Sequence, residues 1–156
     1  MLRAFVALAL LSAPALAAPP PVKEAWDRNA PTAGHAWVRL NAVPGRPAAG
    51  YLTITGGGQP DRLVAVTAPG VRVEMHTMAM AGGVMSMQKL DGLAVPAGAT
   101  ISFAPGGNHL MLFGLGQVPA SLPLTLKFAS GKSLVVPAQI RNAGDDAPPP
   151  ADHSVH

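Results

Sequence analysis

Cysteine is absent from this chain of 156 residues. The chain therefore contains no disulfide bonds, and a folded domain must be stabilised by its packed core alone. Several metal centres are also excluded, because blue-copper sites need a thiolate and zinc ribbons and iron–sulfur clusters are held by cysteines. A bacterial lipoprotein anchor is not expected either, because no cysteine follows the first apolar segment.

Charged residues are scarce as well. Asp, Glu, Lys and Arg make up 12% of the chain, and the formal net charge at pH 7 is +3. Lys and Arg do not cluster among aromatic residues, so nucleic-acid binding is not predicted. The sequence has no Gly-x-Ser-x-Gly motif and no cysteine nucleophile, and Glu74 is the only acid beside the histidines and methionines discussed below. We therefore expect the protein to have no enzymatic activity.

Long apolar runs are missing, and the one at the start of the chain is short. Arg3 precedes an apolar run over residues 4–11, and the sequence Ala-Leu-Ala at 15–17 is a small-x-small cleavage site. This pattern predicts a Sec-type signal peptide over residues 1–17. A membrane anchor is the alternative, but a spanning helix needs about 20 apolar residues. We expect a soluble protein exported to the periplasm, with no membrane insertion after cleavage.

The rest of the chain alternates apolar and polar residues over short segments that are separated by turn signals. The 17 glycines and 17 prolines argue against long helices. We predict one all-β domain, either a β-sandwich or a small Greek-key barrel. The predicted strands are His35–Asn41, Gly50–Thr55, Arg62–Thr67, Val71–Thr77, Val84–Leu90, Thr100–Ala104, His109–Leu115, Leu122–Ala129 and Ser133–Ile140.

This domain is predicted to occupy residues 35–141. A proline-rich leader over residues 18–34 precedes it, and the polar, proline-rich tail over residues 142–156 is expected to be disordered. The domain is expected to be a monomer.

Methionine is concentrated in one part of the chain. Six of the seven methionines lie between Met75 and Met111, where two histidines also lie. His76, Met87, His109 and Met111 follow the spacing His-x10-Met-x21-His-x-Met. Neutral imidazole and thioether together suit monovalent copper better than hard cations, which prefer oxygen. We interpret these four residues as the ligands of one soft-metal site.

Strand alternation supports this grouping in the second half of the motif. Alternate side chains of a strand point to the same face. Leu110 and Leu112 are expected to face the core, so His109 and Met111 share the opposite face.

The first half of the motif follows the same rule. Val73 and Met75 are expected to face inward and His76 outward. The turn at Ala81–Gly83 can fold Met87 back beside the strand of His76. We therefore expect the four ligands within a few ångströms of one another on an exposed rim of the domain.

The other methionines allow different interpretations. Met75 alternates with valines and is interpreted as core packing, because the flexible thioether fits irregular gaps. Met78, Met80 and Met85 flank the glycine turn. They are candidates for auxiliary metal ligands or for an apolar docking rim, and ordinary packing is the remaining alternative.

The segment from Val73 to Leu115 resembles the PCuAC family of periplasmic copper chaperones. That family is marked by His-x10-Met-x21-His-x-Met, and all four positions match without a gap. GVMSMQKLDGLAVPAG, APGGNHLMLFGL, AAGYLTITGGG at Ala48–Gly58 and LPLTLKFASGKSLVVPAQI are also similar to the family. The resemblance covers roughly Trp37 to Ile140.

The resemblance implies a cupredoxin-like β-sandwich in which His76, Met87, His109 and Met111 bind Cu(I). It also implies delivery of copper to the copper centre of a haem–copper respiratory oxidase, alongside a thioredoxin-like chaperone of the Sco type. Some relatives have tails proposed to bind Cu(II), which makes His153 and His156 weak candidates here. A solvated tail or a cloning remnant is the simpler interpretation of these two histidines.

Two other functions stay open. The protein could buffer copper without a dedicated recipient, or it could be an interaction module whose methionine rim binds a protein partner and no metal.

Overall fold

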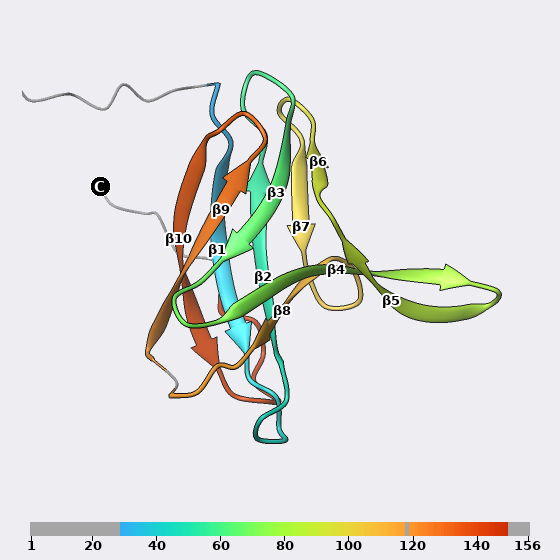
Figure 1. The fold of residues 1–156 in the computed structure, drawn as a ribbon, viewed down its shortest axis with the longest axis vertical. Coiled ribbons are helices and arrows are strands. Elements are labelled where there is room, and N and C mark those ends of the chain that lie inside the picture. Colours follow the sequence, from blue (N-terminus) through green and yellow to red (C-terminus); the bar gives the residue numbers. More distant parts are fainter. Residues whose placement is uncertain (1–28, 118, 150–156) are drawn as a thin grey trace, which may run out of the picture.

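The computed structural model describes residues 29–117 and 119–149, and within them the chain is all-β (Figure 1). The prediction of an all-β domain is confirmed. The described residues contain no helix that is long and apolar enough to cross a membrane. The predicted signal peptide lies outside these ranges, as do His153 and His156.

The described residues form ten strands. They are β1 Thr32–Arg39, β2 Ala48–Thr55, β3 Asp61–Thr67, β4 Arg72–Ala81, β5 Val84–Leu90, β6 Leu93–Val95, β7 Thr100–Phe103, β8 His109–Phe113, β9 Ser121–Phe128 and β10 Ser133–Arg141.

Nine of these strands match the predicted segments, and the bounds differ at several ends. β6 was not predicted, because three residues between two turns are too few for alternation to be visible. β1 begins at Thr32, inside the segment predicted as a leader. Its pairing with β2 shifts register between Gly34 and Trp37, which marks a β-bulge. His35 sits in this bulge with a φ of 52°.

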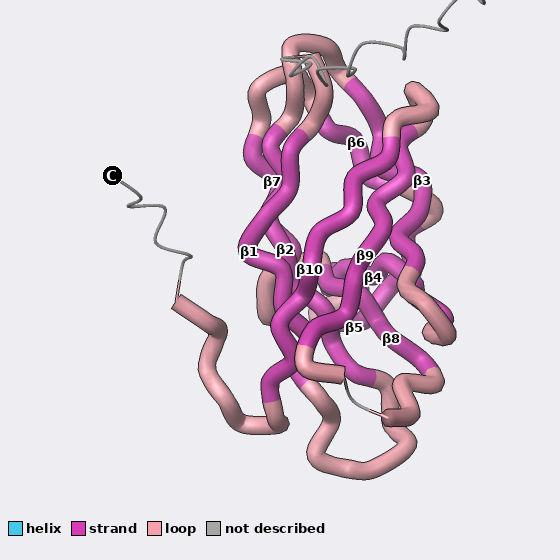
Figure 2. Tube along the Cα trace, turned by 90° about the vertical axis from the view of Figure 1, so that its left-hand side faces the viewer, coloured by secondary structure: helices cyan, strands magenta, loops and turns pink. Residues whose placement is uncertain are grey.

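All ten strands belong to one sheet, in the order β5-β4-β8-β2-β1-β10-β9-β3-β6, with β7 paired to β2. β1 and β10 are parallel, with Trp37 opposite Gln139, and every other pairing is antiparallel. The sheet curls around one core, so β3 and β4 come into contact although they are far apart in the strand order (Figures 1 and 2).

The core consists of inward-facing side chains from both sides of the curled sheet. Leu110 and Leu112 of β8 are fully buried, as the alternation of that strand predicts. Met75 is 5% exposed and packs in the same core, which confirms its interpretation as a packing residue. The outward-facing positions of β4 and β8 are therefore the ones available for a site.

The hairpin of β4 and β5 projects from the body of the domain (Figure 1). β4 was predicted to end at Thr77 but continues to Ala81, because it pairs with β5 along its whole outer half. Gly82 and Gly83 close the hairpin with φ angles of 58° and 79°. Positive φ at both positions is the requirement of a type I′ turn, which glycine meets without strain.

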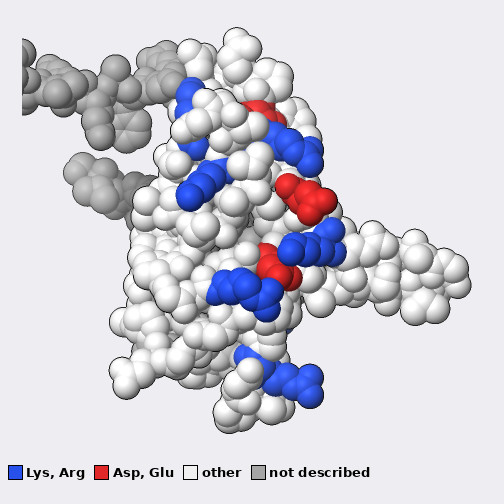
Figure 3. Space-filling view, in the orientation of Figure 1, with Lys and Arg blue, Asp and Glu red and all other residues white. Residues whose placement is uncertain are grey.

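We call residues 77–88 of this hairpin the arm. Its sequence contains no Asp, Glu, Lys or Arg. The projecting part is correspondingly free of charge in Figure 3, and the charged side chains lie on the body. The arm thus presents a neutral surface to solvent.

Candidate functional site

Strand pairing brings the two motif histidines together. His76 of β4 lies directly opposite His109 of β8, and their ring centroids are 5.9 Å apart. Met111 lies opposite Glu74, two residues further along the same pair of strands. The motif residues of β4 and β8 therefore lie on one face of the sheet, as predicted.

His109 and Met87 are in direct contact. His109 Nδ1 lies 2.9 Å from the carbonyl oxygen of Gly107. Because a carbonyl can only accept, Nδ1 carries the proton in the neutral ring and Nε2 carries the free electron pair. This Nε2 lies 3.2 Å from Met87 Sδ. Two electron-pair donors thus face each other, which is the arrangement that a shared metal ion requires.

The ring of His76 is oriented through its other nitrogen, Nε2. Its Nε2 lies 3.0 Å from Glu74 Oε2, and the carboxylate accepts the proton of that nitrogen. Its Nδ1 is buried and has no hydrogen-bond partner. A buried ring nitrogen without a partner is costly unless something binds it, so the free electron pair of Nδ1 fits a metal ligand.

The expectation that His76 is exposed is wrong. Its side chain lies on the outer face by alternation, yet the residue is only 8% exposed. The ring of His109 lies next to it at an interplanar angle of 29°. Lys89, directly opposite on β5, reaches across to Glu74 with Nζ 3.5 Å from Oε1. These neighbours bury a side chain that the alternation along β4 alone would predict to be exposed.

Glu74 is the site residue whose role was not recognised in the sequence. Besides His76 it pairs with Arg72 and Lys89. The hydrogen bond from His76, together with the positive charges of Lys89 and Arg72, holds the pKa of Glu74 below its usual range. The carboxylate stays ionised and can orient the ring of His76. Its position two residues before His76, on the same face, is the signal that points to this role.

Met111 lines a groove of about 290 Å³ beside His109. Met78 of the arm lines the same groove, so one of the three additional methionines lies next to the motif. The groove is formed by Arg39, Ala49, Tyr51, Met78, Pro105, Gly106, His109 and Met111. Met80 and Met85 lie further out on the arm, opposite each other.

The donor set of this cluster consists of imidazole nitrogen and thioether sulfur. Within residues 29–117 and 119–149, no group of three or more His, Asp and Glu side chains could hold a metal ion. A hard cation therefore finds no oxygen-rich cluster there, whereas the His–Met cluster suits a soft monovalent ion.

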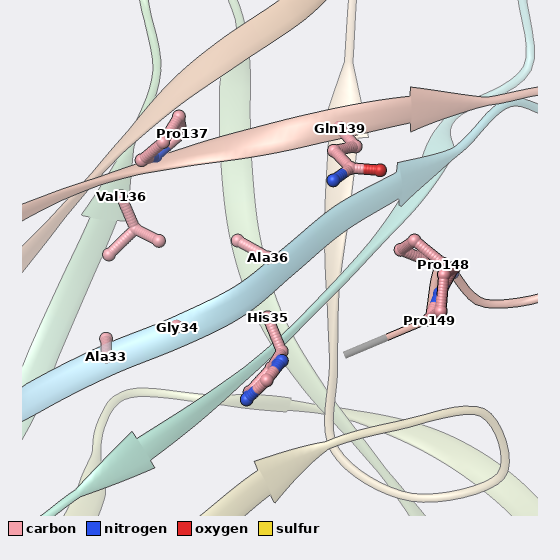
Figure 4. Close-up of a pocket in the computed structure, with 9 residues that line it drawn as sticks. All are labelled: Ala33, Gly34, His35, Ala36, Val136, Pro137, Gln139, Pro148 and Pro149. Carbon is pink, nitrogen blue, oxygen red and sulfur yellow. The ribbon is translucent and has the colours of Figure 1, made fainter. Parts of the chain in front are cut away.

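A second hollow lies away from this cluster, between β1, β10 and the chain that follows β10 (Figure 4). Its volume is about 340 Å³, and His35 is the only titratable residue among those that line it. The other lining groups are Ala33, Gly34, Ala36, Val136, Pro137, Gln139, Pro148 and Pro149. His35 and Gln139 carry the only polar side chains among these described residues.

The chain is similar to known proteins over most of the domain. The family described as "Putative lipoprotein LpqE-like" matches residues 32–140. "Putative lipoprotein Lxx21020" from Leifsonia xyli subsp. xyli (strain CTCB07) is 29% identical over 111 residues, which are 69% of this chain and 67% of that protein.

Solved structures show the same fold. The solution structure of CuI-DR1885 from Deinococcus radiodurans is 31% identical, with a TM-score of 0.55 over 70% of this chain and 76% of that one. The apo PCuAC domain from PmoF1 is 26% identical, with a TM-score of 0.59 over 75% and 98%. The copper-bound PCuAC domain from PmoF2, at 22% identity and a TM-score of 0.58 over 72% and 92%, is similar in fold. The prediction of a cupredoxin-like fold is confirmed.

Proposed function

The chain belongs to the LpqE-like family, the family of PCuAC domains, and from this premise we propose that it is an exported copper chaperone. It binds Cu(I) through His76, Met87, His109 and Met111 and passes the ion to another protein. Copper is the cargo of this protein, and the chain has no role as an enzyme.

One observation carries the proposal. His109 Nε2 and Met87 Sδ are 3.2 Å apart, and the hydrogen bond of Nδ1 to Gly107 leaves no proton between them. His76 Nδ1 adds a second buried nitrogen without a partner. Two nitrogen donors and two thioethers, all neutral, stabilise Cu(I) rather than Cu(II) or a hard divalent ion.

Export is supported by two independent features. The name of the Leifsonia relative includes the word lipoprotein, which implies a protein outside the cytoplasm. Residues 1–17 have the pattern of a cleaved signal peptide. We assign the protein to the periplasm, where ligands that do not pair into disulfides are an advantage.

Delivery rather than storage is supported by the exposure of the site. Met87 is 48% exposed, so an incoming ligand can reach the metal from solvent. Displacing a neutral thioether leaves no buried charge behind. The recipients we propose are the copper centre of a haem–copper oxidase or a Sco-type chaperone. Copper buffering without a recipient is the second candidate.

Anaerobic transfer tests this proposal. The Cu(I)-loaded domain is mixed with the soluble copper domain of an oxidase, or with a reduced Sco-type protein, and copper is measured in each after separation. We expect copper to move to the acceptor, because a dithiolate binds Cu(I) more strongly than imidazole and thioether do. Retention of copper against both acceptors would favour buffering, and failure to bind Cu(I) at all would exclude both functions.

Glu74 gives a prediction of its own. We expect Glu74→Gln to weaken Cu(I) binding about 10–100-fold, the usual effect of losing a group that orients a metal-binding histidine. The neutral amide oxygen is a weaker acceptor for His76 Nε2–H than the carboxylate, and the amide NH2 can donate to the other tautomer instead, so the orientation and tautomer of the ring are less firmly fixed. Competition with a Cu(I) chelator measures the affinity, and ¹⁵N NMR of the imidazole reports the tautomer.

The control for this variant is Lys89→Gln. It removes a charge that contacts Glu74 but leaves the contact of Glu74 with His76 in place. We expect a smaller loss of affinity and an unchanged tautomer. The two substitutions change the local charge in opposite directions, so equal losses would mean that disturbing the ion pairs around Glu74, and not the orientation of His76, lowers the affinity.

A further inference from the structure

Four methionines form a ladder of two rungs on one face of the arm. Met78 lies directly opposite Met87, and Met80 lies directly opposite Met85. Directly opposed side chains of an antiparallel pair share a face, with Cβ atoms about 5 Å apart. Side chains two residues apart on a strand share that face as well. This is the face of His76, so the ladder runs from the metal site to the tip of the arm.

The sulfur is confined to this face. The opposite face of the arm carries Ala79, Ala81, Val84 and Ser86 at the corresponding paired positions, and none of them contains sulfur.

Exposure separates the outer rung from ordinary packing. Met80 is 65% exposed and Met85 is 50% exposed, so neither contributes to the core. The arm itself contains no charged side chain, so no charged group of the arm competes with these thioethers for a bound ion (Figure 3). The two thioethers are therefore soft, neutral donors that are accessible from solvent and lie at directly opposed positions of the hairpin.

We propose that Met80 and Met85, with Met78 as a third donor, form a second and weaker Cu(I) site at the outer end of the arm. Each Met has three rotatable bonds, so opposed thioethers can converge on one ion. The site is weaker than the first because it lacks imidazole. This inference rests on the proposed function, since it extends the route by which copper reaches the first site.

Passage between the two sites is ligand exchange. The sulfur of Met87 joins the ion while Met78 still holds it, and the outer thioethers then leave. Copper remains Cu(I) throughout, and no proton moves because thioethers do not titrate. The direction is inward, toward the site that contains the histidines.

Stoichiometry tests the inference. The domain with methionine labelled at the methyl carbon is titrated with Cu(I), or with Ag(I) as a redox-stable substitute, under anaerobic conditions and followed by NMR. We expect the first equivalent to move the methyl resonances of Met87 and Met111, and the second to move those of Met80 and Met85. Saturation at one equivalent, with Met80 and Met85 unmoved, would overturn the second site and leave the proposed function standing. Binding of no equivalent would contradict the proposed function itself.

The Met80→Leu/Met85→Leu double variant keeps the apolar area and removes both sulfurs. We expect its stoichiometry to fall from two to one, with the affinity for the first equivalent unchanged. Val84→Leu is the matched control, because Val84 is 66% exposed on the opposite face of the same hairpin, and it should still bind two. A double variant that still binds two ions would overturn the inference. So would a wild-type domain that binds one ion and delivers it at the same rate as the double variant, because the two sulfurs would then contribute neither to binding nor to delivery.

Discussion

Replacing His109 with alanine is expected to weaken Cu(I) binding by more than about 100-fold, because losing only an orienting group already costs about 10–100-fold. His109 lies between the other ligands of the cluster. Its Nε2 is 3.2 Å from Met87 Sδ, and its ring lies beside that of His76. The side chain is half-buried on the outer face of β8, so the core behind it is unaffected. Chelator competition gives the affinity, and thermal unfolding of the apo protein shows whether the fold is retained.

The control for this experiment is His35→Asn. His35 lies in the bulge of β1 beside the second hollow, and asparagine tolerates its positive φ better than most residues do. We expect its Cu(I) affinity to match the wild type. If the two variants lose copper equally, the His–Met cluster is not the binding site.

Leu110→Ala is expected to lower the free energy of unfolding by about 2–5 kcal/mol, the cost of removing a large side chain from a close-packed core. Leu110 is fully buried, and it lies opposite Gly50 on β2. A Cβ atom at Gly50 would come within 3.1 Å of Leu110 Cβ, so the two strands are too close for much rearrangement to fill the cavity. Urea unfolding of the apo protein measures the loss.

Met111, the next residue on β8, should affect copper binding strongly and the free energy of unfolding only slightly. Met111→Leu conserves the volume of a side chain on the outer face and should change the unfolding free energy by less than about 1.5 kcal/mol. It removes a thioether ligand, so it should weaken copper binding markedly, whereas folded Leu110→Ala should still load copper. Loss of stability in Met111→Leu comparable to that of Leu110→Ala would show that Met111 packs in the core and is not a ligand.

The sequence predicts those parts of the fold that depend on alternation and turn chemistry. Leu110 and Leu112 were expected in the core, and both are fully buried. The turn at Ala81–Gly83 was expected, because consecutive glycines favour the positive φ angles that close this hairpin.

The burial of His76 and the role of Glu74 were not predicted. The alternation of side chains along a strand predicts which face each one occupies. The side chains that bury His76 come from other strands, however: His109 on β8 and Lys89 on β5. The choice of the free ring nitrogen depends on where the oxygens of Glu74 and Gly107 lie. The cover over His76 is a tertiary contact, which no local pattern encodes. The two oxygens lie only two residues from their histidines, but the residue types alone do not state how each ring is turned.

Because β1 pairs with β10, the sheet cannot be completed until the last strand of the domain has been synthesised. Contacts between residues as distant in sequence as Trp37 and Gln139 form slowly, since much of the chain must lose its conformational freedom before they form. While Ser133–Arg141 is still inside the ribosome, β1 and β9 lack the strand that lies between them and joins the two halves of the sheet. A chain in that state cannot complete its fold, and a chain that is not fully folded is the form that a secretion channel can thread across a membrane. Late pairing of β1 with β10 therefore suits the proposed function, in which the chain is exported before it folds and binds copper.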